Sequence, residues 1–382
     1  MLPLIHLAGN APIVFLLHMN GFLIALATNF TAVGAFSAIY ELGGGAVLNS
    51  TLLPGVTLTD AMPYEGSLLV TGLNGSRPFM AEINVRSWTI TNETGKLPTN
   101  FQPYAAADLG GELVLGGSSQ GHASLIALNG TTIINETSEL PSNYLGSTIV
   151  LLAPLNGSLL VAASTQYPSM LIGVLGSRGF TDLTGRLPIN PDFAFPTTVA
   201  VYGDEAFIGG FSVAGSEEPV GEGEYLQLNQ LGFKPIALLL VNGTFRDLAP
   251  VLGMSYGAIF DASFINSTAL AVAGGYLINS GWAPYVALVE NGRAITYQLP
   301  LDGAAFAVTK ELEVGGGINV FYNLTELVGE PFIATATNAI VPSEPQPAAA
   351  TSFTALGYAI AVALIAGALI GLLMMSTLED EK

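Results

Sequence analysis

The sequence predicts an all-β fold, a seven-bladed β-propeller, followed by a single C-terminal transmembrane helix. Three observations carry this prediction. Strand and turn features recur in the same order roughly every 45 residues, the length of a propeller blade. The chain of 382 residues has 45 Gly and 22 Pro and is 50% apolar, as expected for many short strands joined by tight turns. An uncharged apolar run at residues 353–375 is long enough to cross a bilayer.

The repeat is marked by a proline, usually after leucine, at intervals of 43 to 62 residues: Pro54, Pro98, Pro141, Pro188, Pro250 and Pro300. Each unit holds an apolar strand, a turn such as Asn20-Gly21, and a second strand that ends in small residues. A third strand that often opens with proline, a second turn such as Asn242-Gly243 and a fourth strand follow. Asn-Gly supplies the positive φ angles of a two-residue hairpin. One such sheet cannot bury both of its faces, so neighbouring units are expected to stack around an axis.

The count of second strands gives seven blades, centred near Ala25, Val70, Val114, Val161, Ile208, Val272 and Val314. The seventh unit has no good fourth strand, so we expect residues 3–7 to complete it and close the ring within a propeller domain of residues 1–341. In the alternative, residues 1–27 are a signal peptide that ends Ala25-Leu26-Ala27, and the ring has six blades. Against this, no Lys or Arg precedes Arg77.

The second strands that end in Gly-Gly, with a fourth strand close to a Leu-Pro turn, resemble kelch and galactose-oxidase-like propeller repeats over about 330 residues. Kelch units also carry a Tyr and a Trp after the di-glycine, whereas this chain has only Trp88 and Trp282. The resemblance to galactose oxidase would imply a copper site made of His and Tyr side chains with a Cys crosslink. The chain has no Cys, so this site cannot form. The resemblance therefore implies the architecture and no copper chemistry.

The C-terminal part is predicted as a Pro/Ala stalk at residues 342–352, the transmembrane helix at 353–375 and a cytoplasmic tail at 376–382. Ten Asn-x-Ser/Thr sequons precede the helix, where chance would give roughly three. Because every sequon lies before the helix, we expect that part to be extracellular and N-glycosylated. The sequons begin at Asn29, Asn49, Asn74, Asn92, Asn129, Asn135, Asn156, Asn242, Asn266 and Asn323.

The net charge of the chain limits the kinds of partner that it could bind. The net charge is −19, with only ten Lys and Arg, which excludes a surface that tracks phosphates and therefore nucleic-acid binding. A surface with few cations also gains little positive charge when its carboxylates protonate, which limits self-repulsion in acid. We therefore expect an archaeal-type surface glycoprotein that faces an acidic exterior.

Few residues predict chemistry. His6, His18 and His122 lie in different units, so no metal site is predicted. Aspartates near first strands and first hairpins would ring one face and bind a cation or sugar, or would simply serve the turns; they are Asp60, Asp108, Asp204, Asp261 and Asp302. The fifth unit has an insertion after Gly210 whose acidic residues form either a partner or cation loop or a solvated loop. They are Glu217, Glu218, Glu222 and Glu224. No cofactor is predicted. The loop could bind Ca²⁺, although it lacks the Asp-x-Asp spacing of a strong calcium loop.

These features predict a non-enzymatic, membrane-anchored cell-surface glycoprotein. Its propeller would bind protein or glycan partners, or act as an accessory subunit of an envelope assembly. The alternative is a surface enzyme, a carboxylate-dependent glycoside hydrolase with two acids at the propeller axis.

Overall fold

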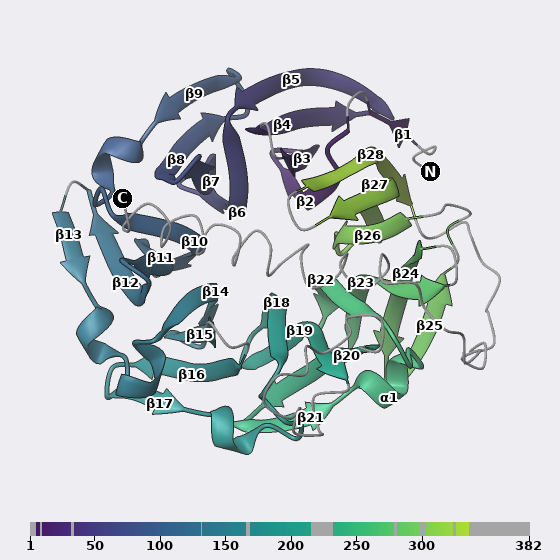
Figure 1. Cartoon of the computed structure of the whole chain (residues 1–382). Coiled ribbons are helices and arrows are strands. Elements are labelled where there is room, and N and C mark those ends of the chain that lie inside the picture. Colours follow the sequence, from purple (N-terminus) through teal and green to yellow (C-terminus); the bar gives the residue numbers. More distant parts are fainter. Residues whose placement is uncertain are drawn as a thin grey trace, which may run out of the picture.

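The structure is a ring of seven antiparallel blades arranged around a common axis (Figure 1). It is a computed structural model that describes residues 5–7, 10–31, 34–130, 132–165, 169–214, 232–278, 281–297, 299, 303–323 and 326–335. The predicted stalk, transmembrane helix and cytoplasmic tail and the four glutamates of the acidic loop lie outside these residues. Within the described ranges, none of the helices has the length and apolar character needed to span a membrane.

Each blade contains four strands, named here from the axis outward. The innermost strands are β2 (Ile13–Met19), β6 (Val56–Tyr64), β10 (Phe101–Leu109), β14 (Ser147–Leu155), β18 (Ala194–Tyr202), β22 (Ala258–Asn266) and β26 (Gly303–Val308). The second strands are β3 (Phe22–Thr31), β7 (Ser67–Asn74), β11 (Glu112–Ser119), β15 (Ser158–Thr165), β19 (Glu205–Ala214), β23 (Ala269–Ile278) and β27 (Glu313–Asn323). The third strands are β4 (Gly34–Gly43), β8 (Arg77–Asn84), β12 (His122–Asn129), β16 (Met170–Gly176), β20 (Gly232–Val241), β24 (Gly281–Glu290) and β28 (Glu326–Thr335).

The outermost strands are β5 (Ala46–Pro54), β9 (Thr89–Asn92), β13 (Thr132–Asn135), β17 (Gly179–Asp182), β21 (Thr244–Asp247), β25 (Arg293–Tyr297) and β1 (Ile5–His6). Short helices follow several of these strands: the 3₁₀ helices η1 (Thr94–Lys96), η2 (Thr137–Glu139), η3 (Ser142–Tyr144) and η4 (Thr184–Arg186), and the α-helix α1 (Ala249–Leu252). The seven predicted second strands are all present.

Blades 2 to 6 are separate four-stranded sheets, whereas blades 1 and 7 join into one eight-stranded sheet. Among the described residues, the join is a single pair between Leu327 of β28 and Phe30 of β3. Strand β1 pairs antiparallel with β28, so a segment from the start of the chain lies at the outer edge of blade 7. The six-bladed alternative is wrong, because the residues that it assigned to a signal peptide include β2 and part of β3, which are strands of blade 1.

The predicted Asn-Gly turns are confirmed at several hairpins. Asn20, Asn156 and Asn242 all have φ angles near +50°, and the glycine after each also has a positive φ. Asparagine tolerates this left-handed conformation better than other residues with a side chain do. The turns therefore set strand lengths and keep the blades in register.

Every innermost strand carries a β-bulge at the same place. Its pairing with the second strand skips one residue, as between Leu58 and Asp60 or between Ile259 and Asp261. A bulge leaves the extra residue out of the ladder and bends the strand. The seven extra residues all face the axis: Val14, Thr59, Tyr104, Val150, Thr197, Phe260 and Phe306.

The bulge also explains the glycines that end the second strands. A Cβ at Gly117 would lie 1.9 Å from the main-chain oxygen of Gln102, and one at Gly210 would lie 2.0 Å from that of Phe195. The preceding glycine of a pair faces the next blade, since a Cβ at Gly116 would lie 2.5 Å from Ile149. At these positions glycine therefore permits close approach of the innermost strand of its own blade and of side chains from the next blade.

In the described part of the chain, seven clusters of buried side chains form the core, and each lies between two neighbouring blades. The cluster between blades 3 and 4, for example, brings Val114 of β11 against Ile149 of β14 and Val161 of β15. Full burial of one such side chain is worth about 1.5–3 kcal/mol. Each blade therefore depends on both of its neighbours, and the ring must close to bury every face.

Candidate functional site

The innermost strands of all seven blades line a cavity of about 390 Å³ on the ring axis. A pocket of this size is within the range that holds a small organic ligand. Its lining combines aliphatic and aromatic side chains with threonine hydroxyls and two carboxyls. The polar members are Thr28, Thr57, Thr59, Asp60, Tyr104, Thr197, Thr198 and Asp261.

Asp60 follows the bulge of β6 and bridges blades 2 and 3. Its Oδ1 accepts a hydrogen bond from the main-chain N–H of Ala61 at 2.7 Å. Its Oδ2 accepts one from the main-chain N–H of Ala106, in the innermost strand of the next blade, also at 2.7 Å. The bulge residue Thr59 adds a second bridge, because its hydroxyl donates to the main-chain oxygen of Pro103 at 2.8 Å.

Asp261 occupies the same position after the bulge of β22 and bridges blades 6 and 7. Its Oδ1 accepts hydrogen bonds from the main-chain N–H of Ala262 at 2.8 Å and from the hydroxyl of Thr198 at 3.1 Å. Its Oδ2 accepts a hydrogen bond from the main-chain N–H of Val308 at 2.9 Å. The two aspartates therefore play equivalent roles in different parts of the ring.

Both carboxyls face the cavity but lie deep in the molecule. Burial raises the pKa of Asp60 to about 6, and the hydrogen bonds from Ala106 and Ala61 oppose this shift only in part. Burial likewise raises the pKa of Asp261 to about 6 against the hydrogen bonds from Val308, Ala262 and Thr198. Desolvation disfavours the charged form of a carboxyl, which accounts for both directions.

The other predicted aspartates do not join these two. Asp108 closes the turn after β10, where its Oδ1 accepts a hydrogen bond from the main-chain N–H of Gly111 at 2.7 Å. Asp204 lies in the turn between β18 and β19, and Asp302 lies outside the described residues. The structure therefore separates the four described candidates into two axial and two turn residues.

Aromatic rings form part of the cavity wall. Phe260 and Phe306 are bulge residues of adjacent blades, and their ring centroids lie 5.0 Å apart. Tyr104 is almost completely buried, and burial raises the pKa of its phenol. Aromatic faces beside hydroxyl and carboxyl acceptors suit a small ligand that has both an apolar face and hydrogen-bond donors.

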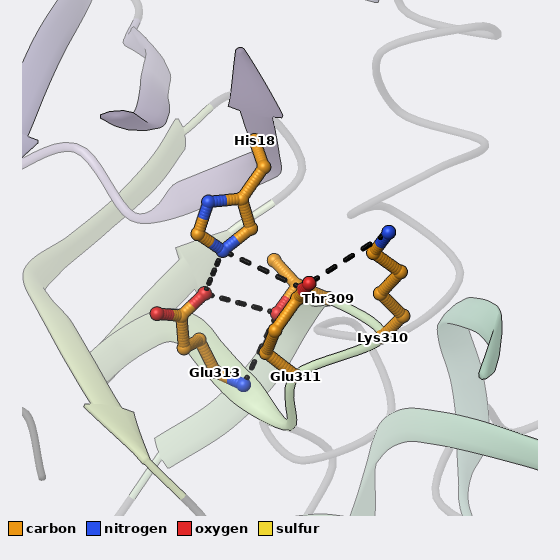
Figure 2. A network of polar contacts seen from close by, with 5 residues as sticks. All are labelled: His18, Thr309, Lys310, Glu311 and Glu313. Atoms are coloured by element: carbon orange, nitrogen blue, oxygen red, sulfur yellow. Dashed lines mark hydrogen bonds and ion pairs between the residues drawn. The ribbon is translucent and has the colours of Figure 1, made fainter. Parts of the chain in front are cut away.

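A second polar cluster lies where blades 1 and 7 meet, and Figure 2 shows how its side chains converge. The Nε2 atom of His18, near the end of β2, lies 2.6 Å from Oε2 of Glu313 and 3.5 Å from Oε2 of Glu311. The hydroxyl of Thr309 donates to Oε2 of Glu313 at 3.1 Å, and Lys310 Nζ lies 3.8 Å from Oε1 of Glu311. Sequence reasoning missed this cluster because His18 and Glu313 are 295 residues apart.

The predicted glycosylation sites differ in exposure. Eight of the ten sequon asparagines are exposed: Asn49, Asn74, Asn92, Asn129, Asn135, Asn156, Asn242 and Asn266. Asn29 is only 2% exposed, its Nδ2 donates to Oδ1 of Asn10, and its Oδ1 accepts from the main-chain N–H of Phe36. A sugar on Nδ2 is therefore incompatible with this position of Asn29. The side chain of Asn323 is not among those described.

Part of the excess of sequons has a structural origin. Oδ1 of Asn92 accepts the main-chain N–H of Thr94, and Oδ1 of Asn135 accepts that of Thr137. The same turn follows β17 with Asp182 and Thr184, where the first residue is not asparagine. Asn or Asp two residues before Thr is thus a turn motif of this propeller. At three blades the motif is also a sequon, since Oδ1 of Asn266 likewise accepts the main-chain N–H of Thr268.

Comparison with known proteins identifies the fold. No family model matches the chain, and no curated protein matches its sequence. It is similar to the extracellular domain of the putative one-component system BT4673 from B. thetaiotaomicron, with a TM-score of 0.53 and 13% identity over 90% of this chain and 44% of that one. It is also similar to a prolyl endopeptidase, with a TM-score of 0.50 and 11% identity over 88% of this chain and 51% of that one.

A chain of the mitotic checkpoint complex gives a TM-score of 0.51 and 10% identity over 88% of this chain and 95% of that one. This chain spans about half or less of the length of the first two of these proteins. Together with the seven blades and the axial cavity, these similarities define a β-propeller protein. At such low identity they show the fold alone.

Proposed function

We propose that this protein is a cell-surface binding protein, not an enzyme, and that the axial cavity holds part of its ligand. The observation that carries the proposal is how the two axial carboxyls are used. Both oxygens of Asp60 and both oxygens of Asp261 accept main-chain N–H groups, and in each case one of these belongs to the next blade. The carboxyls thereby fix a rigid cavity, and preorganisation of this kind favours binding.

The chemistry of the wall favours a sugar unit or a similar small, neutral ligand. Phe260 and Phe306 offer apolar faces, while Thr59 and Thr197 offer hydroxyls at the same cavity. A glycan-bearing partner is therefore our first choice among surface ligands. The extracellular domain to which the chain is similar is consistent with such a role outside the cell.

The proposal includes the membrane anchor and the sugars predicted from the sequence. The helix at 353–375 would hold the propeller at the outer face of the membrane, with the stalk at 342–352 as a spacer. Glycans would occupy exposed sequons such as Asn74, Asn156 and Asn266, whose side chains lie at hairpin turns.

A glycoside hydrolase with its site at the same cavity is the second candidate. It is favoured by one observation, namely that two carboxyls with a pKa of about 6 face a single cavity. Such an enzyme needs one acid to deliver its proton to the leaving oxygen of the substrate. The hydrogen bonds of Asp60 and Asp261 to the main chain hold both groups in structural roles instead.

The test uses the full chain in mild detergent with a panel of neutral mono- and disaccharides and short glycans, followed by saturation-transfer NMR. We expect binding of one sugar class without release of a hydrolysis product. The variant Val14→Trp should abolish this binding, because Val14 is a partly exposed bulge residue at the cavity wall. Val14→Ala is the matched control and should retain it.

Two results would contradict the proposal. Sugar release that disappears in Asp60→Asn or Asp261→Asn would establish the enzyme. Binding that is unchanged in Val14→Trp, with the melting temperature of that variant also unchanged, would place the ligand away from the axis.

A further inference from the structure

We propose that His18, Glu311 and Glu313 form a binding site for a divalent metal ion of the Zn²⁺ class, which joins the first and last blades. The inference does not depend on the proposed function. Its basis is that one imidazole nitrogen and two carboxylate oxygens, from opposite ends of the described chain, converge on one point.

The geometry fits a metal ion. The three candidate ligand atoms all lie within 4.8 Å of one another. Ligands of tetrahedral Zn²⁺ with bonds of about 2.0–2.1 Å are spaced about 3.3 Å apart. The contact from His18 to Glu311 is already 3.5 Å, and the contact to Glu313 is 2.6 Å. Side-chain shifts of an ångström or so would complete the site, and Glu311 lies on an exposed turn where such a shift is cheap.

The donor set selects the class of ion. A neutral imidazole with carboxylates is typical of Zn²⁺ and of late first-row transition metals, whereas Ca²⁺ and Mg²⁺ prefer oxygen ligands alone. The imidazole distinguishes this group from an ordinary acidic surface cluster. Three protein ligands leave the fourth position of the ion to water.

Neighbouring groups hold two of the ligands in place. The hydroxyl of Thr309 donates to Oε2 of Glu313, and the main-chain N–H of Glu313 donates back to Oγ1 of Thr309. Lys310 approaches the other oxygen of Glu311, leaving Oε2 toward His18. Partners of this kind orient metal ligands and contribute to affinity.

The location gives the ion a role. His18 belongs to β2 of blade 1, while Glu311 and Glu313 belong to the turn and strand that follow β26 in blade 7. Backbone pairing between the described parts of β28 and β3 is limited to one residue pair, and β1 adds two residues to blade 7. We call the junction between blades 7 and 1 the seam. A metal ion across the seam would bind only the closed ring and would therefore stabilise it.

The experiment measures metal binding by the full chain in mild detergent after removal of metal with EDTA. Co²⁺ should produce the visible absorption of a tetrahedral site with one ion per chain, and Zn²⁺ should displace it. Zn²⁺ at a hundred times its dissociation constant should raise the melting temperature by about 4 °C. Hydrogen exchange should slow in β2 and β26 to β28, and not in blades 3 to 5.

Two variants and their controls decide the outcome. Glu311→Gln changes an exposed residue, keeps the fold and should weaken Zn²⁺ binding at least tenfold, and His18→Ala should abolish the Co²⁺ spectrum. His122→Ala and Glu139→Gln, at surface positions of blade 3, should bind as the parent does. Absence of one bound ion per chain, or binding by Glu311→Gln and His18→Ala that equals binding by the parent, would overturn the site.

Discussion

The junction between blades 2 and 3 and the junction between blades 7 and 1 are held by different kinds of contact. In the first, Asp60 and Thr59 bind the main chain of β10 beside the axis. Both residues lie at the bulge of β6, a feature that every blade repeats. In the second, the described residues of β28 and β3 share one backbone pair, and the main-chain N–H of Gly329 donates to the main-chain oxygen of Asn10 at 3.1 Å. The polar side-chain contact there is between His18 and Glu313 at the surface. A repeat can copy the first arrangement, whereas only folding of the whole chain can produce the second.

The hydrophobic cores differ in the same way. The cluster between blades 3 and 4 draws many residues from both blades. The cluster at the seam is built mainly from blade 1, and among the described residues β26 and β28 supply only Ala307 and Ile333 to its buried part. The seam is therefore the junction at which added contacts have most effect, and we expect the ring to open there first.

The largest expected effect concerns the glycine opposite the bulge. Gly117→Ala places a Cβ against the main chain of β10, and we expect it to lower the free energy of unfolding by about 3 kcal/mol or more. Blades 1 and 4 have Ala27 and Ala163 at the equivalent position, so their bulges must differ in detail. Denaturant unfolding measures the change.

The control for this variant is Gly185→Ala, since no atom lies within 4 Å of a Cβ at that position. This change should stay within about 0.5 kcal/mol. If Gly117→Ala and Gly185→Ala lowered the free energy of unfolding equally, the close contact between Gly117 and the main chain of β10 would be contradicted.

The next effect concerns pH and the axial carboxyls. With pKa values of about 6, folded Asp60 and Asp261 keep their protons between about pH 4 and pH 6, where the unfolded chain has lost them. The free energy of unfolding should therefore fall as pH rises through this window, by about 2 kcal/mol for each group. Asp261→Asn should remove its share of the slope in chemical unfolding at pH 4 and pH 7.

Asp182 provides the opposite case. Burial raises its pKa, but hydrogen bonds from Thr184, Asn143 and Tyr144 outweigh burial and leave the pKa below its usual value. Its contribution is present above the unfolded pKa and is lost as the pH falls. Asp182→Asn should therefore lower stability near pH 7 and have little effect in strong acid, where the parent has already lost this contribution. A parent protein that becomes more stable from pH 4 to pH 7 would contradict the assignment of the axial pair.

A smaller effect is expected for Asn29 at the seam. Asn29→Ala leaves the main-chain N–H of Phe36 without its side-chain partner and removes the contact to Asn10. We expect a loss of about 1–2 kcal/mol, measured by denaturant unfolding, and glycopeptide mapping should find Asn29 unmodified. Asn74→Ala, at an exposed hairpin, should change stability by less than about 0.5 kcal/mol. A glycan on Asn29 would contradict the packing of β3.

The smallest effect is expected for His18→Ala without metal. The side chain of His18 is 34% exposed and that of Glu311 is 44% exposed, and contacts of this type contribute less than about 1 kcal/mol in water. Thermal unfolding in EDTA should show nearly the parent value. A large loss in EDTA would mean that the direct His–Glu contact, and not an ion, holds the seam.

The repeat, the strand order and many turns could be predicted from the sequence because they depend on local signals. Asn156-Gly157 and Asn242-Gly243 produce the same backbone conformation wherever they occur. Proline was less informative, since Pro235 and Pro284 lie inside β20 and β24 and not at their first residues. In those blades the hairpin between the second and third strands is longer than expected, with strands of ten residues on each side.

The site could be predicted only in part. Asp60 and Asp261 were among the candidates, but so was Asp108, and only the position relative to the bulge separates them. The bulge residues include aliphatic, hydroxyl and aromatic side chains, such as Val14, Thr59 and Phe260, so no residue type marks the bulge in the sequence. The cluster around His18 depends on which side chains meet when the ring closes, and no local pattern encodes that.

The most direct test of the account is native mass spectrometry of the full chain, produced in its native cells and purified in mild detergent. We predict a chain that carries glycans at exposed sequons and retains a small ligand or a glycan-bearing partner, which is lost in Val14→Trp and kept in Val14→Ala. A bare chain without sugars, ligand or partner, identical in both variants, would contradict the account.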